Sequence, residues 1–181
     1  MGKVLIKNGK AYVYDGFLLR WITKNGKRFP IINKEKISGG MNPDGDEAEE
    51  YAKWYYGVIE KRKNDYKRIA KNTGYTEEEI KSIKDYIFSE KHNLKDGYRK
   101  FDPSYAMAES WRRLTEGKEI QPHDLVLLKH ELLEMKMVRE QGIPQPTAHN
   151  RASKIYNYGK GAKEFYGNRR KHYKGWRKNY P

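Results

Sequence analysis

The sequence contains no cysteine, which excludes disulfide bonds and zinc sites built from thiolates. It has no apolar run that approaches the ~18 residues of a membrane-spanning helix. The first ten residues, MGKVLIKNGK, also lack the apolar core of a secretory signal. These absences predict a soluble protein of the cytoplasm with no membrane partner.

The signature motifs of several enzyme classes are absent as well. The sequence has no glycine-rich phosphate loop, no Ser/His/Asp arrangement and no calcium-binding EF-hand loop. No reaction class, metal or cofactor therefore follows from a motif alone. The sequence leaves open whether the protein is an enzyme.

Acidic residues are scarce at both ends of this 181-residue chain, whose net charge is +14. Residues 1–40 carry a net +7, residues 41–150 a net −2 and residues 151–181 a net +9. Basic residues concentrated in this way favour a polyanionic partner, so the sequence predicts binding to DNA or RNA. The alternative is a basic protein whose charges are simply solvated.

The first forty residues alternate turn signals with short apolar runs. Asn8-Gly9, Asp15-Gly16 and Asn25-Gly26 suit the two-residue turns of β-hairpins. The runs between them are rich in branched and aromatic residues, which favour strands. This pattern predicts a small antiparallel β-meander over residues 1–40, followed by the linker SGGMNPDGD.

Four or five helices are predicted after the linker, from apolar residues at helical spacing and from signals at the helix ends. Thr76 and Glu79 form a capping box, and Gly117 and Gly142 stop helices. The predicted helices cover residues 47–71, 77–92, 103–116, 122–141 and 147–158. The predicted fold class is therefore α+β, with a β-meander (1–40), a helical module (41–158) and a basic aromatic tail (159–181).

The tail interleaves lysine and arginine with aromatic side chains. Lysine and arginine neutralise phosphates, and aromatic rings stack on exposed bases. The alternative is an ordered tail whose aromatic rings pack on the helical module. The predicted nucleic-acid-binding residues at the two ends are Lys24, Lys27, Arg28, Lys160, Lys163, Arg169, Arg170, Lys171, Lys174, Trp176, Arg177 and Lys178.

The candidate catalytic residues lie in the segment KHELLE and just beyond it. They are His130, Glu131, Glu134 and His149. His130 and Glu134 are four residues apart and share one face of a helix, whereas Glu131 is rotated by roughly 100°. HELLE has Glu134 where the zinc motif HExxH has its second histidine.

Three interpretations of this cluster remain open. His130 and Glu131 fit buried structural residues, and His130 also fits a metal-free acid or base. A metal site made of His130, Glu134 and His149 requires the helix after Gly142 to fold back antiparallel on the helix before it. We assign no metal ligands from the sequence alone.

Several residues within the predicted helical module form a recognisable pattern: Phe101-Asp102-Pro103, Ala108, Trp111, Arg113-Leu114, Lys129-His130-Glu131, Glu134 and Ala148-His149. With these residues, the segment 67–158 resembles a helical module found at the C-termini of phage minor head (head-morphogenesis) proteins and in polymorphic-toxin-like bacterial proteins. The resemblance implies a phage origin, hence a host-cell cytoplasm, and no settled activity. The chain departs from the large head proteins because it lacks their portal-associated domain and has the basic tail.

Three functions follow, in this order of preference. The first is a phage-derived nucleic-acid-binding protein that interferes with host machinery, for example by inhibiting a CRISPR or other defence nuclease, with a host nucleoprotein as a possible partner. The second is a toxin-type nuclease or hydrolase that uses the histidine and glutamate cluster. The third is a phage head or packaging accessory protein.

Overall fold

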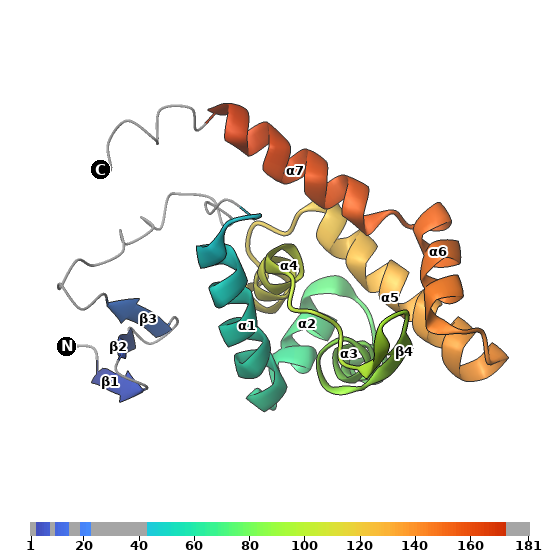
Figure 1. Cartoon of the computed structure of the whole chain (residues 1–181), viewed down its shortest axis with the longest axis horizontal. Coiled ribbons are helices and arrows are strands. Elements are labelled where there is room, and N and C mark those ends of the chain that lie inside the picture. Colours follow the sequence, from blue (N-terminus) through green and yellow to red (C-terminus); the bar gives the residue numbers. More distant parts are fainter. Residues whose placement is uncertain (1–2, 8–9, 15–18, 23–42, 173–181) are drawn as a thin grey trace. The chain divides into compact units, whose positions relative to one another are not determined.

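The computed structural model describes residues 3–7, 10–14, 19–22 and 43–172, with the side chains of residues 3–7, 10–14, 19–22, 47 and 168–172 excepted (Figure 1). The chain divides into two units, residues 1–37 and 38–181. In the first unit, strands β1 (Lys3–Lys7), β2 (Lys10–Tyr14) and β3 (Leu19–Ile22) pair antiparallel in that order. The predicted turns Asn8-Gly9, Asp15-Gly16 and Asn25-Gly26 lie outside the described residues.

The predicted α+β fold class is wrong, because the described part of the chain is mostly helical and contains seven α-helices. The small β-meander predicted over residues 1–40 is not supported as a component of the fold. Hairpin signals in a sequence describe local turns, and they do not show that the strands between them build a core. Within the second unit, the only described sheet is the ribbon of β4 (His92–Leu94) and β5 (Gly97–Arg99).

The first half of the helical unit has three helices where two were predicted. The predicted helix 47–71 is two helices, α1 (Asp46–Lys61) and α2 (Asp65–Thr73), and α2 ends at Gly74 with a left-handed φ of 80°. The predicted capping box of Thr76 and Glu79 opens α3 (Glu77–Lys84). A π-helical turn, η1 (Asp85–Ser89), continues α3.

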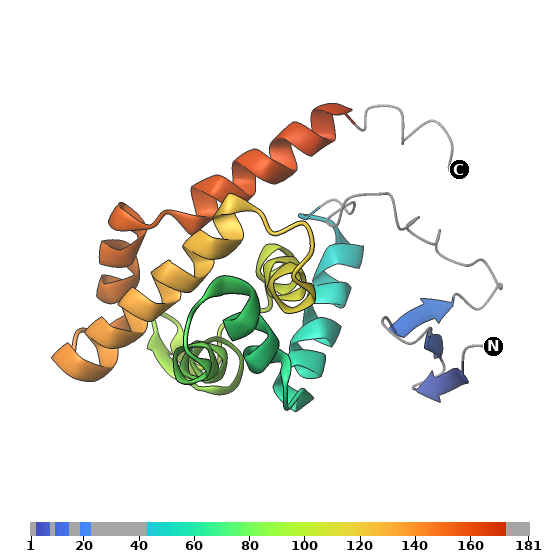
Figure 2. The ribbon, with the colours of Figure 1, turned by 180° about the vertical axis from the view of Figure 1, so that it is seen from behind.

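The second half of the unit holds the longest helix. Ser104 caps α4 (Tyr105–Glu116), and α5 spans Pro122–Gln141. After the reversal at Gly142, α6 (Gln145–Ile155) runs back along α5, and α7 (Tyr158–His172) follows (Figures 1 and 2). The part of the predicted tail up to residue 172 is thus a helix. None of the described helices is long and apolar enough to cross a membrane.

The main core lies between α1, α2, α3, η1, α4 and α5. Trp111 of α4 is fully buried there and packs edge-on against Phe88. Its indole Nε1 donates to Asp65, which also forms a buried ion pair with Lys84. A second cluster joins α1, α4 and α7 through Ala52, Tyr105 and Tyr166, so α7 belongs to the folded unit.

Candidate functional site

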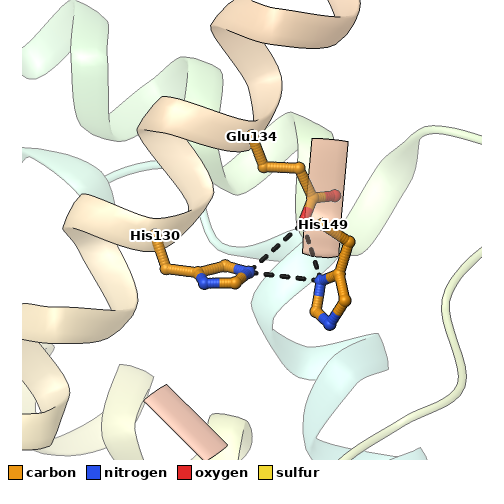
Figure 3. A group of neighbouring side chains, drawn as sticks. All are labelled: His130, Glu134 and His149. Carbon is orange, nitrogen blue, oxygen red and sulfur yellow. Dashed lines mark hydrogen bonds and ion pairs between the residues drawn. The ribbon is translucent and has the colours of Figure 1, made fainter. Parts of the chain in front are cut away.

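The candidate site lies between α5 and α6. One face of α5 presents His130 and Glu134 a single turn apart, and α6 brings His149 opposite them (Figure 3). The reversal after Gly142 makes this meeting possible, because Gly142 adopts a left-handed φ of 64° and Pro144 precedes α6. The fold-back that the sequence set as the condition for a three-residue site is therefore present.

One atom of each side chain contributes to a tight triangle. His130 Nε2 lies 3.2 Å from Glu134 Oε2 and 3.2 Å from His149 Nδ1. His149 Nδ1 lies 2.8 Å from the same Glu134 oxygen. All three atoms are hydrogen-bond acceptors when they carry no proton, so a proton or a metal cation is needed to join them.

The position of the His130 proton follows from its outer hydrogen bond. Nδ1 of His130 lies 2.9 Å from the Tyr156 carbonyl oxygen, which can only accept, so Nδ1 carries a hydrogen and donates it. In the neutral ring, Nε2 then has a bare lone pair that faces Glu134. The described contacts therefore bring together an imidazole lone pair and a carboxylate oxygen at 3.2 Å.

The remaining oxygen of Glu134 is held by two donors from other elements. The Tyr86 hydroxyl donates to Glu134 Oε1 at 2.8 Å, and Gln145 Nε2 donates to the same oxygen at 2.9 Å. These bonds fix the carboxylate so that Oε2 alone faces the two histidines. Such outer hydrogen bonds orient ligand groups and keep a site preorganised.

Tyr86 reaches Glu134 from the π-helical turn η1. Its ring packs edge-on against His92, whose Nε2 donates to the Tyr86 carbonyl oxygen at 2.7 Å, and His92 in turn stacks on Phe101. Single π-helical turns occur often at functional sites because they shift the register of a helical side chain. The η1 turn and the β4–β5 ribbon together support the candidate site.

Burial and hydrogen bonding act in opposite directions on the pKa of Glu134. Burial raises it, but hydrogen bonds from His130, His149, Gln145 and Tyr86 outweigh burial and lower the pKa to about 2. The hydrogen bond with Glu134 raises the pKa of His149 above its ordinary value. Glu134 is therefore ionised at neutral pH, and it attracts positive charge to its neighbours.

The site opens to solvent on one side. The side chains of His130 and Glu134 are 2% and 1% exposed, whereas that of His149 is 52% exposed. The ring nitrogen Nε2 of His149 has no hydrogen-bond partner among the described residues. The cluster therefore has two buried side chains and one, His149, that a molecule in solution can reach.

Glu131 does not join the triangle. It is buried on α5, and burial and the nearby Glu134 charge raise its pKa well above the ordinary value. Of the four candidate catalytic residues, the structure thus brings together His130, Glu134 and His149.

Most of the predicted nucleic-acid-binding residues lie outside what the structure describes. Lys160 and Lys163 are exposed on α7. Arg169, Arg170 and Lys171 belong to α7, but their side chains are outside the described part. Lys24, Lys27, Arg28, Lys174, Trp176, Arg177 and Lys178 lie outside it altogether.

Sequence reasoning misses three contributors to the site: Tyr86, Gln145 and the Tyr156 carbonyl. Tyr86 sits in an apolar helical pattern with no sign of a functional hydroxyl, and a carbonyl leaves no mark in a sequence. The predicted helix over residues 147–158 also starts too late, because α6 begins at Gln145, directly after Pro144.

Comparison with protein-family models, with curated proteins and with solved structures finds no match to this chain. The resemblance to phage minor head and toxin-like modules therefore stays a prediction, as do the phage origin and the cytoplasmic location.

Proposed function

We propose that the protein is a hydrolase that cleaves nucleic-acid phosphodiester bonds at the His130–Glu134–His149 cluster. One observation carries the proposal: a buried, hydrogen-bonded carboxylate holds a half-exposed imidazole whose second nitrogen is unpartnered among the described residues. A carboxylate that orients an imidazole is a recurrent arrangement for proton transfer.

The proton transfer assigned to each residue follows from its contacts. Glu134 Oε2 accepts from His149 Nδ1, which leaves the lone pair of His149 on Nε2, at the exposed edge. That nitrogen takes the proton of a water molecule as the water attacks phosphorus. The bond from phosphorus to the leaving sugar oxygen breaks, and that oxygen takes a proton from solvent water. His130 is held by the Tyr156 carbonyl on the buried side of Glu134.

A polyanionic polymer suits the surroundings of the site. From Gly142 to the end, the chain has ten basic residues and one acidic residue. Two of the basic residues, Arg151 and Lys154, belong to α6, the helix that carries His149. Two hollows among the described residues lie elsewhere, one beside Thr76 and Arg139 and the other beside Pro43 and Tyr105. An open site in a basic region of the chain favours an extended polyanion over a small molecule.

Incubation with end-labelled single- and double-stranded DNA and RNA tests the proposal. We expect cleavage that falls about 100-fold or more in His149→Ala, because a positioned base contributes on the order of 10²–10⁴. The rate should rise with pH through a value above 6.5, since His149 acts unprotonated and its pKa is raised. Asn150→Ala, an exposed neighbour on α6, is the matched control.

A second candidate is binding to nucleic acid without cleavage, through the basic ends of the chain. The exposed Lys160 and Lys163 on α7 favour it, together with the net +9 of residues 151–181. A mobility shift with intact substrate in every condition supports this candidate. Equal cleavage by the wild type and by His149→Ala contradicts the hydrolase proposal.

A further inference from the structure

We infer that the His130–Glu134–His149 cluster is a binding site for one zinc ion, and that hydrolysis requires this ion. The catalytic half of the inference rests on the proposed function, whereas the binding half rests on geometry alone. Its starting point is the triangle of His130 Nε2, Glu134 Oε2 and His149 Nδ1, with sides of 3.2, 3.2 and 2.8 Å.

These distances fit a tetrahedral zinc site. Two ligands, each about 2.0–2.1 Å from zinc, lie roughly 3.3 Å apart when the angle between them is tetrahedral. The three atoms meet this spacing to within about 0.5 Å. Two imidazoles and one carboxylate are also a donor set that zinc takes readily.

The hydrogen bonds around the triangle leave its atoms free to coordinate. Tyr156 holds the proton of His130 on Nδ1, so Nε2 presents a lone pair to the centre. Tyr86 and Gln145 both donate to Oε1 of Glu134, so Oε2 is the oxygen left for a cation. A hydrogen on His149 Nδ1 makes a hydrogen bond along one side of the triangle, to Glu134 Oε2. A metal ion at the centre would interact with all three atoms.

The number of protein ligands points to a catalytic site more than to a structural one. Structural zinc sites in proteins have four protein ligands, whereas catalytic sites have three and leave a position for water. Here the described residues supply three, and the half-exposed His149 places the remaining position toward solvent. Water on zinc ionises near neutral pH, so the ion takes over the water activation that the metal-free cluster leaves to His149.

Zinc binding is measured on the full-length protein without an affinity tag. After loading with zinc chloride and dialysis, we expect one zinc ion per chain by elemental analysis. Cobalt(II) in the same site should give the visible absorption of tetrahedral coordination. Asn150→Ala and Glu140→Gln, exposed on α6 and α5, are controls that should bind as the wild type does.

The variants are chosen so that misfolding does not imitate loss of the ion. His149→Ala removes a half-exposed side chain, and Glu134→Gln keeps the shape of a buried one; both should lose stoichiometric zinc. Tyr86→Phe removes one of the two donors to Oε1 and leaves the ring in place, and it should weaken zinc binding about 10- to 100-fold. Helical circular dichroism verifies that each variant is folded.

Zinc analysis and the cleavage assay separate the two proposals. Stoichiometric zinc with no cleavage of any substrate supports the metal site and overturns the hydrolase function. Full cleavage in the presence of a chelator overturns the zinc requirement and leaves the hydrolase function standing. Absence of stoichiometric zinc, or zinc retained by both His149→Ala and Glu134→Gln, overturns the inference.

Discussion

Two glutamates three positions apart on α5 have opposite electrostatic environments. Glu134 has four polar side chains within hydrogen-bonding distance, and together these contacts outweigh its burial and lower its pKa to about 2. Glu131 is buried without a hydrogen bond from a described residue, and its pKa is raised by burial and by Glu134. The two environments thus shift the pKa values of the two carboxyl groups in opposite directions, so that one is charged and the other neutral over a range of pH.

The two shifts predict opposite contributions to stability as pH changes. Glu134 has a lowered pKa, so its contribution is present above about 4.5 and is lost as pH falls through about 2. Glu131 has a raised pKa, so its contribution is complete below about 4.5 and is lost as pH rises through the raised value. Alkaline pH therefore charges a buried Glu131.

Glu131→Gln should stabilise the protein at high pH, because glutamine fills the same space and never ionises. We expect unfolding temperatures equal to the wild type at pH 5 and higher than the wild type at pH 9. Over the pH range in which Glu131 binds a proton in the folded state only, the free energies of unfolding of the variant and the wild type diverge by at most about 1.4 kcal/mol per pH unit. Thermal unfolding across this pH range is the measurement.

Glu140→Gln, on the exposed surface of the same helix, is the control and should follow the wild-type curve. A lower unfolding temperature of Glu131→Gln at pH 9 would show that the charged form of Glu131 stabilises the fold. That result would contradict a pKa raised by burial and by the Glu134 charge.

At the scale of elements, α7 depends on a close approach to the start of α5. A Cβ atom at Gly161 would lie 2.9 Å from the Cβ of His123, which is closer than side chains pack. The rings of His123 and Phe165 lie 4.8 Å apart, and Tyr166 is buried beside Tyr105. Gly161 therefore has a packing role inside a helix that glycine otherwise weakens.

Gly161→Ala and Gly167→Ala should change stability in opposite directions. Gly167 lies in the same helix, and a Cβ atom there would meet nothing within 4 Å, so alanine should stabilise by about 0.5–1 kcal/mol. At Gly161 the methyl group forces α7 away from His123, and the unfolding temperature should fall. Equal gains at both positions would show that α7 does not pack closely on α5.

Several helix ends were predictable because their signals are local. Gly74, Gly117 and Gly142 each end a helix with a positive φ, as glycines at helix ends commonly do. The break between α1 and α2 was not predictable, because residues 62–64 contain neither glycine nor proline. Its cause is tertiary: Asp65 turns inward to Lys84 and Trp111.

At the scale of the whole molecule, the basic C-terminal region has two parts with different roles. Residues up to 166 carry core side chains, among them Ala162 and Tyr166. Removing everything after residue 158 therefore tests folding as much as binding. A cut after residue 172 is the better test of nucleic-acid affinity.

Deletion of residues 173–181 removes Lys174, Arg177 and Lys178. If all three contact phosphate, the slope of log affinity against log salt should become shallower by about 2.7 on duplex DNA. Binding titrations at several salt concentrations measure the slope, with the unfolding temperature as the check on folding. An unchanged slope would place the phosphate contacts elsewhere, for example at Lys160 and Lys163.

The sequence by itself determined the features that depend on neighbours along the chain. It located α5 by its apolar spacing, the capping box at Thr76, and the pair His130 and Glu134, because residues four apart in a helix share a face. It also set the unequal distribution of charge. These properties need no knowledge of how the helices pack.

Only the tertiary structure determined which residues contact His130 and Glu134 on α5. Folding α6 back on α5 brings His149 to Glu134, and the π-helical turn brings Tyr86 to the other carboxylate oxygen. Tertiary packing also brings α7 into the core, through Ala162 and Tyr166. These contacts join residues 15 and 48 positions apart, and their energies come from packing that no local pattern encodes.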